Sequence, residues 1–133
     1  ALNEAKRVTK PGGLTFVAYL MNEYSILSYC FDEDRIEGLL ERGAVDKDFH
    51  IQAQADELYD YVRIDDINRL DESAGLDRVT IFSPDGASDY MRTRLNRMSD
   101  DTFAHFLEYQ KCISERPDLI GAGSHVVDVV RVG

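Results

Sequence analysis

The first twenty residues carry the clearest hydrophobic pattern of the chain. Apolar side chains recur at helical spacing over residues 2–8, which predicts a short helix. Pro11 ends it, because proline lacks a backbone N–H and disfavours the helical conformation at the residue before it. After two glycines, residues 14–20 are almost all apolar, and this run predicts a strand buried on both faces, as in a parallel sheet.

A second helix–turn–strand unit follows a long polar stretch. Residues 22–41 carry apolar positions near helical spacing and predict helices, whereas the irregular, polar residues 42–60 predict a loop. A further helix opens at Asp65 and is closed by Gly75, a residue type that commonly ends helices in the left-handed conformation. Residues 78–82 then predict a second strand.

The last third of the chain begins with the turn Ser83-Pro-Asp-Gly86 and continues as two predicted helices. Ser99 is the expected N-cap of the longer helix. The final predicted strand spans residues 125–132. The expected buried stripe of the longer helix consists of Phe103, Phe106, Leu107 and Ile113.

Strands thus alternate with helices, which indicates an α/β protein. The 133 residues are enough for a hydrophobic core, and we expect a single domain, 1–133, on a short sheet of about three strands. The final strand is entered from a helical excursion rather than a tight turn. The pattern therefore allows it to run in either direction relative to the other strands.

Composition narrows the classes of partner. The net charge of −10 argues against nucleic-acid binding and against anionic membrane surfaces. No apolar run is long enough to span a bilayer. Cys30 and Cys112 lie in apolar contexts without a Cys or His partner at metal-ligand spacing. We therefore expect two buried free thiols, no metal site and a reducing, cytoplasmic location.

Three stretches together resemble a known enzyme family. The opening Leu2-x-x-Ala-x-Arg-Val-x-Lys-Pro-Gly-Gly13 resembles the segment before the fifth strand of class I, Rossmann-like methyltransferases that use S-adenosylmethionine (SAM), of the ubiquinone-biosynthesis-like type. Residues 64–76 resemble that family's helix before its sixth strand, and residues 107–125 resemble the ending of one bacterial subgroup. The matching stretches cover most of the chain.

The resemblance implies the C-terminal half of such an enzyme. The sheet would be mixed, with the last strand antiparallel between the two earlier ones. Two helical insertions, at about 22–58 and 86–118, would form a lid over a small-molecule substrate. The implied function is the lid-bearing part of a SAM-dependent methyltransferase. The alternative is a non-enzymatic α/β module that dimerises or binds a partner.

The family's SAM-binding elements belong to its front half and have no counterpart in this sequence. There is no Gly-x-Gly-x-x-Gly, and the one Gly-Gly pair lies in a helix-to-strand turn. We therefore expect SAM to serve the longer parent enzyme. This chain by itself is expected neither to bind SAM nor to turn over, and no cofactor-binding residue is assigned.

The expected site lies where ligands sit in such folds, beyond the carboxyl ends of the parallel strands. Residues 19–24, 83–86 and 121–125 would converge there. Methyl transfer depends mainly on the placement of the substrate, so no catalytic residue is assigned. The candidate substrate-binding residues are Tyr19, Asn22, Tyr24, Asp85, Ser124 and His125.

Several of these residues also have a purely structural interpretation. His125 can act as a general base or be a histidine hydrogen-bonded at the start of a strand. Tyr19 and Tyr24 can line an aromatic pocket or pack in the core. His50 can reach the site from its loop or remain solvated. One helix face is expected to pack rather than to bind metal: His105, Tyr109 and Cys112.

Two further expectations concern charge and association. Asp128 lies in a valine-rich strand, where a carboxylate is costly unless it is paired. Its partner is expected to be an N-terminal arginine, unless the strand end is exposed. Without the neighbour that the family fold places beside it, the strand over residues 14–20 would present an apolar edge, which favours a homodimer through that edge.

Overall fold

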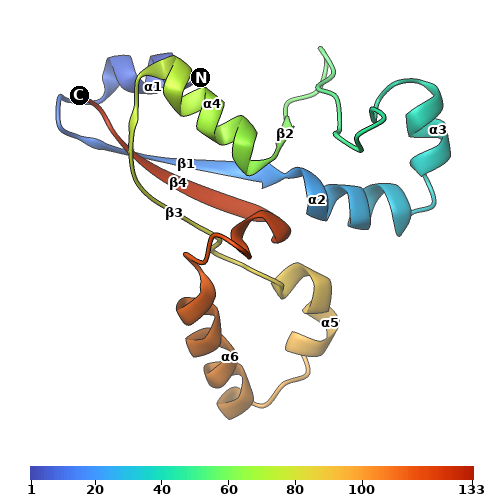
Figure 1. The fold of residues 1–133 in the computed structure, drawn as a ribbon. Coiled ribbons are helices and arrows are strands. Elements are labelled where there is room, and N and C mark those ends of the chain that lie inside the picture. Colours follow the sequence, from blue (N-terminus) through green and yellow to red (C-terminus); the bar gives the residue numbers. More distant parts are fainter.

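The computed structural model describes all residues, 1–133, and is built on one curved four-stranded sheet (Figure 1). The sheet has the order β2-β1-β4-β3. Its strands are β1 (Leu14–Met21), β2 (Tyr61–Val62), β3 (Asp77–Phe82) and β4 (His125–Arg131). The α/β class is confirmed, but the expected count of about three strands is too low. The additional strand β2 pairs in parallel with only the last two residues of β1, and so short a strand leaves no periodic signal in the sequence.

Six α-helices accompany the sheet, with shorter helical turns between them. The helices are α1 (Leu2–Val8), α2 (Asn22–Ser25), α3 (Ile36–Glu41), α4 (Ile64–Ala74), α5 (Arg92–Leu95) and α6 (Asp100–Ile113). A π-helical segment, Ile26–Phe31, extends α2, and 3₁₀ turns span Ser88–Met91 and Ile120–Ala122. None of the helices combines the length and apolar character that a bilayer crossing requires.

The helix boundaries follow the local signals in the sequence. Gly75 ends α4 in the left-handed conformation, with φ of 60°. The hydroxyl of Ser99 caps α6 by accepting a hydrogen bond from the Thr102 amide. Two aspartates occupy the first turn of each of these helices, where negative charge is favourable.

The final strand lies between the two longer strands that precede it in the chain. β4 is antiparallel to β1 on one side and to β3 on the other, so β1 and β3 run parallel to each other. This is the order and direction implied by the resemblance described above. The carboxyl ends of β1 and β3 therefore share one edge of the sheet with the amino end of β4.

Helices α1 and α4 pack on one face of this sheet (Figure 1). Ile67 of α4 is fully buried and joins a core cluster with Met21 and Val126. The alternate residues of β1 project from the opposite face, where Phe16 remains 66% exposed. The expectation that this strand is buried on both faces is therefore wrong. A continuous apolar run is compatible with burial on both faces but does not supply a second covering layer.

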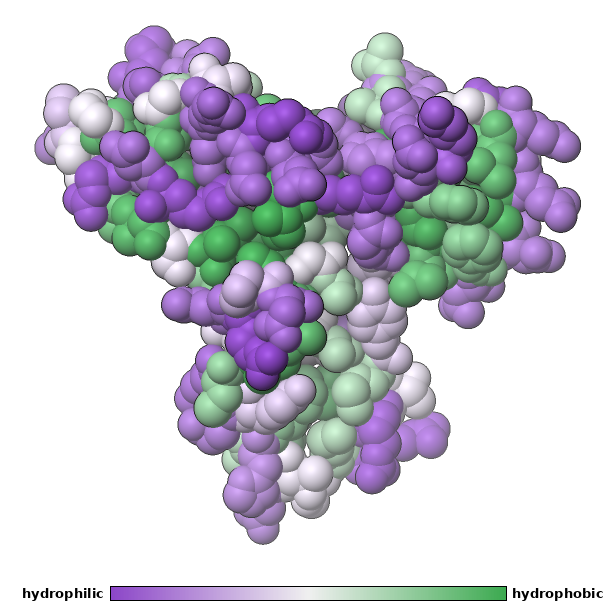
Figure 2. Space-filling view, in the orientation of Figure 1, coloured by the Kyte–Doolittle hydropathy of each residue, from purple (hydrophilic) through white to green (hydrophobic).

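The two helical excursions differ in how they pack. The segment of α2 and α3 has a small core of its own, whereas α5 and α6 form an arm that projects from the end of β3 (Figure 1). Phe103 and Leu107 of α6 are exposed, so the expected fully buried stripe is wrong; Gln110 is the buried residue of this helix. The space-filling view shows apolar surface along the sheet below the polar outer side of α4 (Figure 2).

Three side chains on the arm correct further expectations. Cys112 is exposed rather than buried, whereas Cys30 is buried as expected. His105 and Tyr109 are also exposed, so the helix face that they share with Cys112 does not pack against the protein. An amphipathic pattern specifies which face of a helix is apolar, but the tertiary structure decides whether another element covers that face.

The fully buried Asp128 has a partner that the sequence pattern did not indicate. Arg78 of β3 binds it with Nε 2.8 Å from Oδ1 and Nη2 3.2 Å from Oδ2. The prediction that an N-terminal arginine pairs with Asp128 is therefore wrong. A β-bulge between Arg78 and Thr80 puts Arg78 and Ile81 on the same face of the sheet as Asp128. Strict alternation along β3 would place only one of them there.

Candidate functional site

Three segments that are distant in sequence meet at the edge formed by β1, β3 and β4. The amide of Met21 donates to the carbonyl of Ser124 over 3.0 Å. The hydroxyl of Ser83 donates to the carbonyl of His125 over 3.2 Å. The expected convergence of residues 19–24, 83–86 and 121–125 is thus present in the structure.

A compact group of polar side chains occupies this edge, and we call it the edge cluster: Asp85, Asp89, Ser124 and His125. Nδ1 of His125 lies 2.5 Å from Oδ2 of Asp85. Oγ of Ser124 lies 2.8 Å from the same Asp85 oxygen and 2.5 Å from Oδ2 of Asp89. Ser124 is buried, whereas the His125 side chain is 42% exposed. The cluster therefore presents its imidazole to solvent and keeps its hydroxyl inside.

Two glycines allow the loops that carry the edge cluster to approach each other. Gly86 has a φ of 51°, and its amide donates to Oγ of Ser83 over 3.0 Å, which closes the turn after β3. A Cβ on Gly123 would lie 2.7 Å from Oγ of Ser83 and 2.8 Å from the Gly86 carbonyl oxygen. The loop before β4 can therefore come close enough to pair His125 with Asp85 only because it carries glycine there.

The geometry of the edge cluster suits proton transfer or the orientation of a hydroxyl group. When Nδ1 of His125 donates to the Asp85 carboxylate, Nε2 is the nitrogen that can accept a proton or a hydrogen bond from a ligand. Hydrogen bonds from Ser124 and Arg92 hold the pKa of Asp89 below its usual range. Proton transfer of this kind requires an imidazole and a carboxylate that orients its ring, and His125 and Asp85 supply these two groups.

The same donors also lie close enough to surround a cation. Donor atoms of Asp85, Asp89 and His125 lie within 4.8 Å of one another. However, the guanidinium of Arg92 is already 2.5 Å from Oδ1 of Asp89 and supplies positive charge there. Arg92 and Ser124 thus both contact the Asp89 carboxylate.

Two aromatic side chains, one from α2 and one from the 3₁₀ turn Ser88–Met91, border the edge cluster. Tyr24 and Tyr90 meet edge to face, with ring centroids 5.0 Å apart. The Tyr90 hydroxyl donates to the carbonyl of Ala122 over 2.8 Å. Both rings and Asp89 line a hollow of about 310 Å³. Tyr24 and Tyr90 thus lie beside the cluster, next to its member Asp89. Asp89 and Tyr90 were not among the residues expected from the sequence.

A second, mostly apolar cavity lies behind the turn after β3. It has a volume of about 160 Å³ and is bordered on one side by α6. Tyr90 forms part of its wall together with Phe106 and Ile113, and Gly86 and Gly123 form its floor. Tyr90 therefore lines both this cavity and the hollow beside Tyr24.

Tyr19 does not join the edge cluster. It projects from the face covered by α4, because residues alternate along β1 and its neighbour Leu20 is the one opposite His125. Its hydroxyl is buried without a hydrogen-bond partner. Burial, and then the carboxylates of Asp71 and Asp128, raise the pKa of Tyr19 to about 12. Tyr19 therefore belongs to the interior between the sheet and α4.

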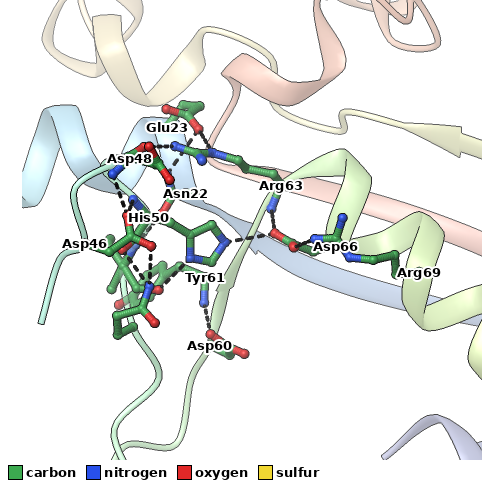
Figure 3. Close-up of polar contacts among 12 residues, drawn as sticks. Asn22, Glu23, Asp46, Asp48, His50, Asp60, Tyr61, Arg63, Asp66 and Arg69 are labelled. Atoms are coloured by element: carbon green, nitrogen blue, oxygen red, sulfur yellow. Dashed lines mark hydrogen bonds and ion pairs between the residues drawn. The ribbon is translucent and has the colours of Figure 1, made fainter.

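Asn22 also lies away from the edge cluster and holds the loop of residues 49–51 in place (Figure 3). It is fully buried at the start of α2. Its Oδ1 accepts from the Ile51 amide over 2.8 Å, and its Nδ2 donates to the Phe49 carbonyl over 2.9 Å. Phe49 has a φ of 57°, an unusual conformation for a bulky residue, and this contact helps to hold it.

Next to Asn22, charged side chains connect the loop that carries Asp48 and His50 to α4 (Figure 3). Nε2 of His50 lies 2.9 Å from Oδ2 of Asp66, so His50 is neither solvated nor part of the edge cluster. Arg63 reaches Oε1 of Glu23 over 2.5 Å and the Asp48 carbonyl over 2.9 Å. Burial by itself would raise the pKa of Asp66, but hydrogen bonds from the Arg63 amide and from His50 outweigh it, and the pKa lies below its usual value. These contacts tie the loop that carries Asp48 and His50 to the start of α4.

The glycine turn after α1 is engaged in hydrogen bonds within the fold. The amide of Gly12 donates to the Val132 carbonyl over 2.7 Å, and the amide of Gly13 donates to the Lys10 carbonyl over 2.8 Å. The glycine amides that could cradle an anionic or nucleotide group are therefore engaged within the fold.

A scan against protein-family models finds no match for this chain, and a search of curated proteins finds none either.

Proposed function

We propose that this chain is the C-terminal, lid-bearing part of a Rossmann-like SAM-dependent methyltransferase that acts on a small molecule in the cytoplasm. The sequence resemblance described above motivates the proposal. The observation that carries it is the topology: an antiparallel final strand lies between two parallel strands and gathers three loops at one edge. In open α/β sheets, that edge is where ligands bind.

In this proposal, the edge cluster contacts the substrate. Asp85 orients the His125 ring, and Nε2 of His125 receives a hydrogen bond from the substrate. The rings of Tyr24 and Tyr90 contact the apolar part of the substrate in the hollow beside Asp89. The segment of α2 and α3 and the α5–α6 arm flank this edge and limit the size of molecule that fits.

The proposal assigns SAM binding to residues outside this chain, since the glycine turn offers no free amides. The chain alone is therefore inactive. Isothermal titration calorimetry with SAM tests this on two proteins, the 133-residue chain and the longer product of its gene. Binding by the longer product alone is the expected result. An absence of binding by both proteins would contradict the proposal.

The alternative function, a non-enzymatic α/β module that dimerises or binds a partner, is favoured by a different observation. Beyond its last two residues, β1 has no strand paired along one side. An unpaired edge of this kind invites association with another chain. In the calorimetric experiment, the absence of SAM binding by both proteins would leave this alternative as the better proposal.

A further inference from the structure

The sheet leaves two sets of backbone groups without a neighbouring strand, on the outer side of β3 and on the side of β1 that β2 does not cover. The amide of Val132 donates to the Gly13 carbonyl, and the amide of Met21 donates to the Ser124 carbonyl, each over 3.0 Å. In an antiparallel ladder, alternate residues face the same neighbour. The intervening residues Leu14, Phe16 and Ala18 therefore direct their N–H and C=O groups away from β4.

The open segment has defined ends. At its carboxyl end, β2 pairs with Leu20 and Met21. At its amino end, Pro11 and the two glycines turn the chain away from the edge, and the Gly12 amide is bonded to Val132. A strand added here can therefore pair with the residues from Leu14 to Ala18, and Phe16 is the centre of that segment.

We infer that a second copy of this chain pairs antiparallel with β1, about a two-fold axis at Phe16. The edge is complementary to itself in this arrangement. Phe16 faces the Phe16 of the other copy, and the large Leu14 faces the small Ala18 on each side. All three side chains are exposed in the single chain. Pairing joins the two sheets and brings the two phenyl rings against each other.

Charge favours the same antiparallel arrangement. Exposed basic residues lie at the amino end of β1, and exposed acidic residues lie in the loop that leads to β2 at its carboxyl end. An antiparallel two-fold places the basic end of one copy beside the acidic end of the other, whereas a parallel arrangement would bring like charges together. The residues concerned are Lys10 and Arg131, and Asp56, Glu57 and Asp60. Arg7 lies at the same end as Lys10 but is already paired with Glu4.

Exposed apolar residues beside the strand extend the contact. Helix α1 packs on the covered face of the sheet, and its last residue, the exposed Val8, precedes the turn that leads into β1. A largely apolar groove of about 450 Å³ lies at the other end, between α1, α4 and the loop that carries Leu58 and Tyr59. The two-fold brings Val8 of each copy to the groove of the other. Hydrophobic contact therefore supplements the strand pairing.

Sedimentation velocity of the 133-residue chain over a range of concentrations tests the pairing. We expect a dimer, and we expect Phe16→Arg to raise the dissociation constant on the order of 100-fold, because two guanidinium groups would face each other at the axis. The matched control is Val79→Arg, which changes a 49% exposed apolar residue on β3 and should leave the dimer intact. Both positions are exposed, so neither variant should prevent folding.

A second pair of variants tests the charge arrangement. Lys10→Glu should raise the dissociation constant about five-fold, because it replaces an attraction at two symmetric places. Lys47→Glu makes the same change of net charge in an exposed loop away from the edge and should have no such effect.

Hydrogen exchange identifies the edge directly. The Phe16 and Ala18 amides should be protected in the dimer and lose that protection on dilution. A monomer at about 100 µM, or a dimer that Val79→Arg weakens as much as Phe16→Arg, would overturn the inference. Protection of the same two amides in a monomer would overturn it as well, because another part of the polypeptide would then cover the edge.

Discussion

Asp71 gives the sharpest prediction of how stability responds to pH. Its Oδ2 lies 2.7 Å from Nη2 of Arg78, which also binds the buried Asp128, and its Oδ1 has no hydrogen-bond partner. Two carboxylates therefore share one guanidinium in the interior between α4 and the sheet. Burial and the neighbouring Asp128 raise the pKa of Asp71 from 3.8 to about 6, and Arg78 opposes this only in part.

The sign follows from proton binding. Between the usual pKa and about 6, the folded chain holds a proton on Asp71 that the unfolded chain has lost. This contribution to stability is therefore present at low pH and is lost as the pH rises through about 6. A shift of about 2 pKa units corresponds to about 3 kcal/mol in full. Between about pH 7.5 and about pH 4.5, the expected change is about 2 kcal/mol.

Asp71→Asn removes this titration and keeps an oxygen that can accept from Arg78. The measurement is the free energy of unfolding in urea, for the wild type and the variant, at both pH values. The difference, wild type minus Asp71→Asn, should increase by about 2 kcal/mol from the higher to the lower pH. Taking the difference cancels the opposite contribution of carboxylates whose pKa is lowered, such as Asp46 and Asp66.

The control is Asp65→Asn, which removes an exposed carboxylate from the same helix and should follow the wild-type profile. If the curves of wild type and Asp71→Asn stay parallel over this pH range, the reasoning about the buried pair of carboxylates is refuted.

Three other substitutions or reagents test the contacts around the site. Gly123→Ala should lower the free energy of unfolding in urea by about 1–3 kcal/mol, because its Cβ would overlap Ser83 and Gly86. The control Gly38→Ala places its Cβ in open space and should be neutral or stabilising. Asn22→Ala should lower the free energy of unfolding by about 2 kcal/mol and speed hydrogen exchange of the Ile51 amide, because it leaves the Ile51 amide and the Phe49 carbonyl unpaired. The control Asn96→Ala changes an exposed asparagine and should have neither effect. Unchanged exchange at Ile51 in Asn22→Ala would contradict the assigned contact. A thiol reagent should modify Cys112 alone in the folded chain and both cysteines after unfolding, because burial shields Cys30 and raises the pKa of its thiol; fast reaction of both in the folded chain would disagree with the structure.

Part of the candidate site could be anticipated from sequence. The turn after residue 82 and the glycines before β4 marked two loops, and the resemblance implied that they share one edge; Asp85, Ser124 and His125 do meet there. Asp89 and Tyr90 were missed because they lie in a short 3₁₀ turn, which has no strong periodic signal. Their position four and five residues after Asp85, one turn further along the chain, was the available hint.

Other side chains could not be placed from the pattern of the chain. Tyr19 and Asn22 are near in sequence to the edge, but the strand alternation turns Tyr19 toward α4, and Asn22 binds a loop nearly thirty residues later. The bulge that brings Arg78 to Asp128 is equally invisible, because it depends on how β3 pairs with β4 rather than on its composition.

The sequence by itself determined the longer local elements: the helices α1, α4 and α6 and the strands β1, β3 and β4. Those properties depend on backbone conformation and on side chains a few residues apart, such as Gly75 and Ser99. Only the tertiary structure decided which apolar faces are covered and which charges are paired. Phe16 is exposed because no element covers its face of the sheet. These outcomes depend on contacts between distant segments, which a local pattern permits but does not specify.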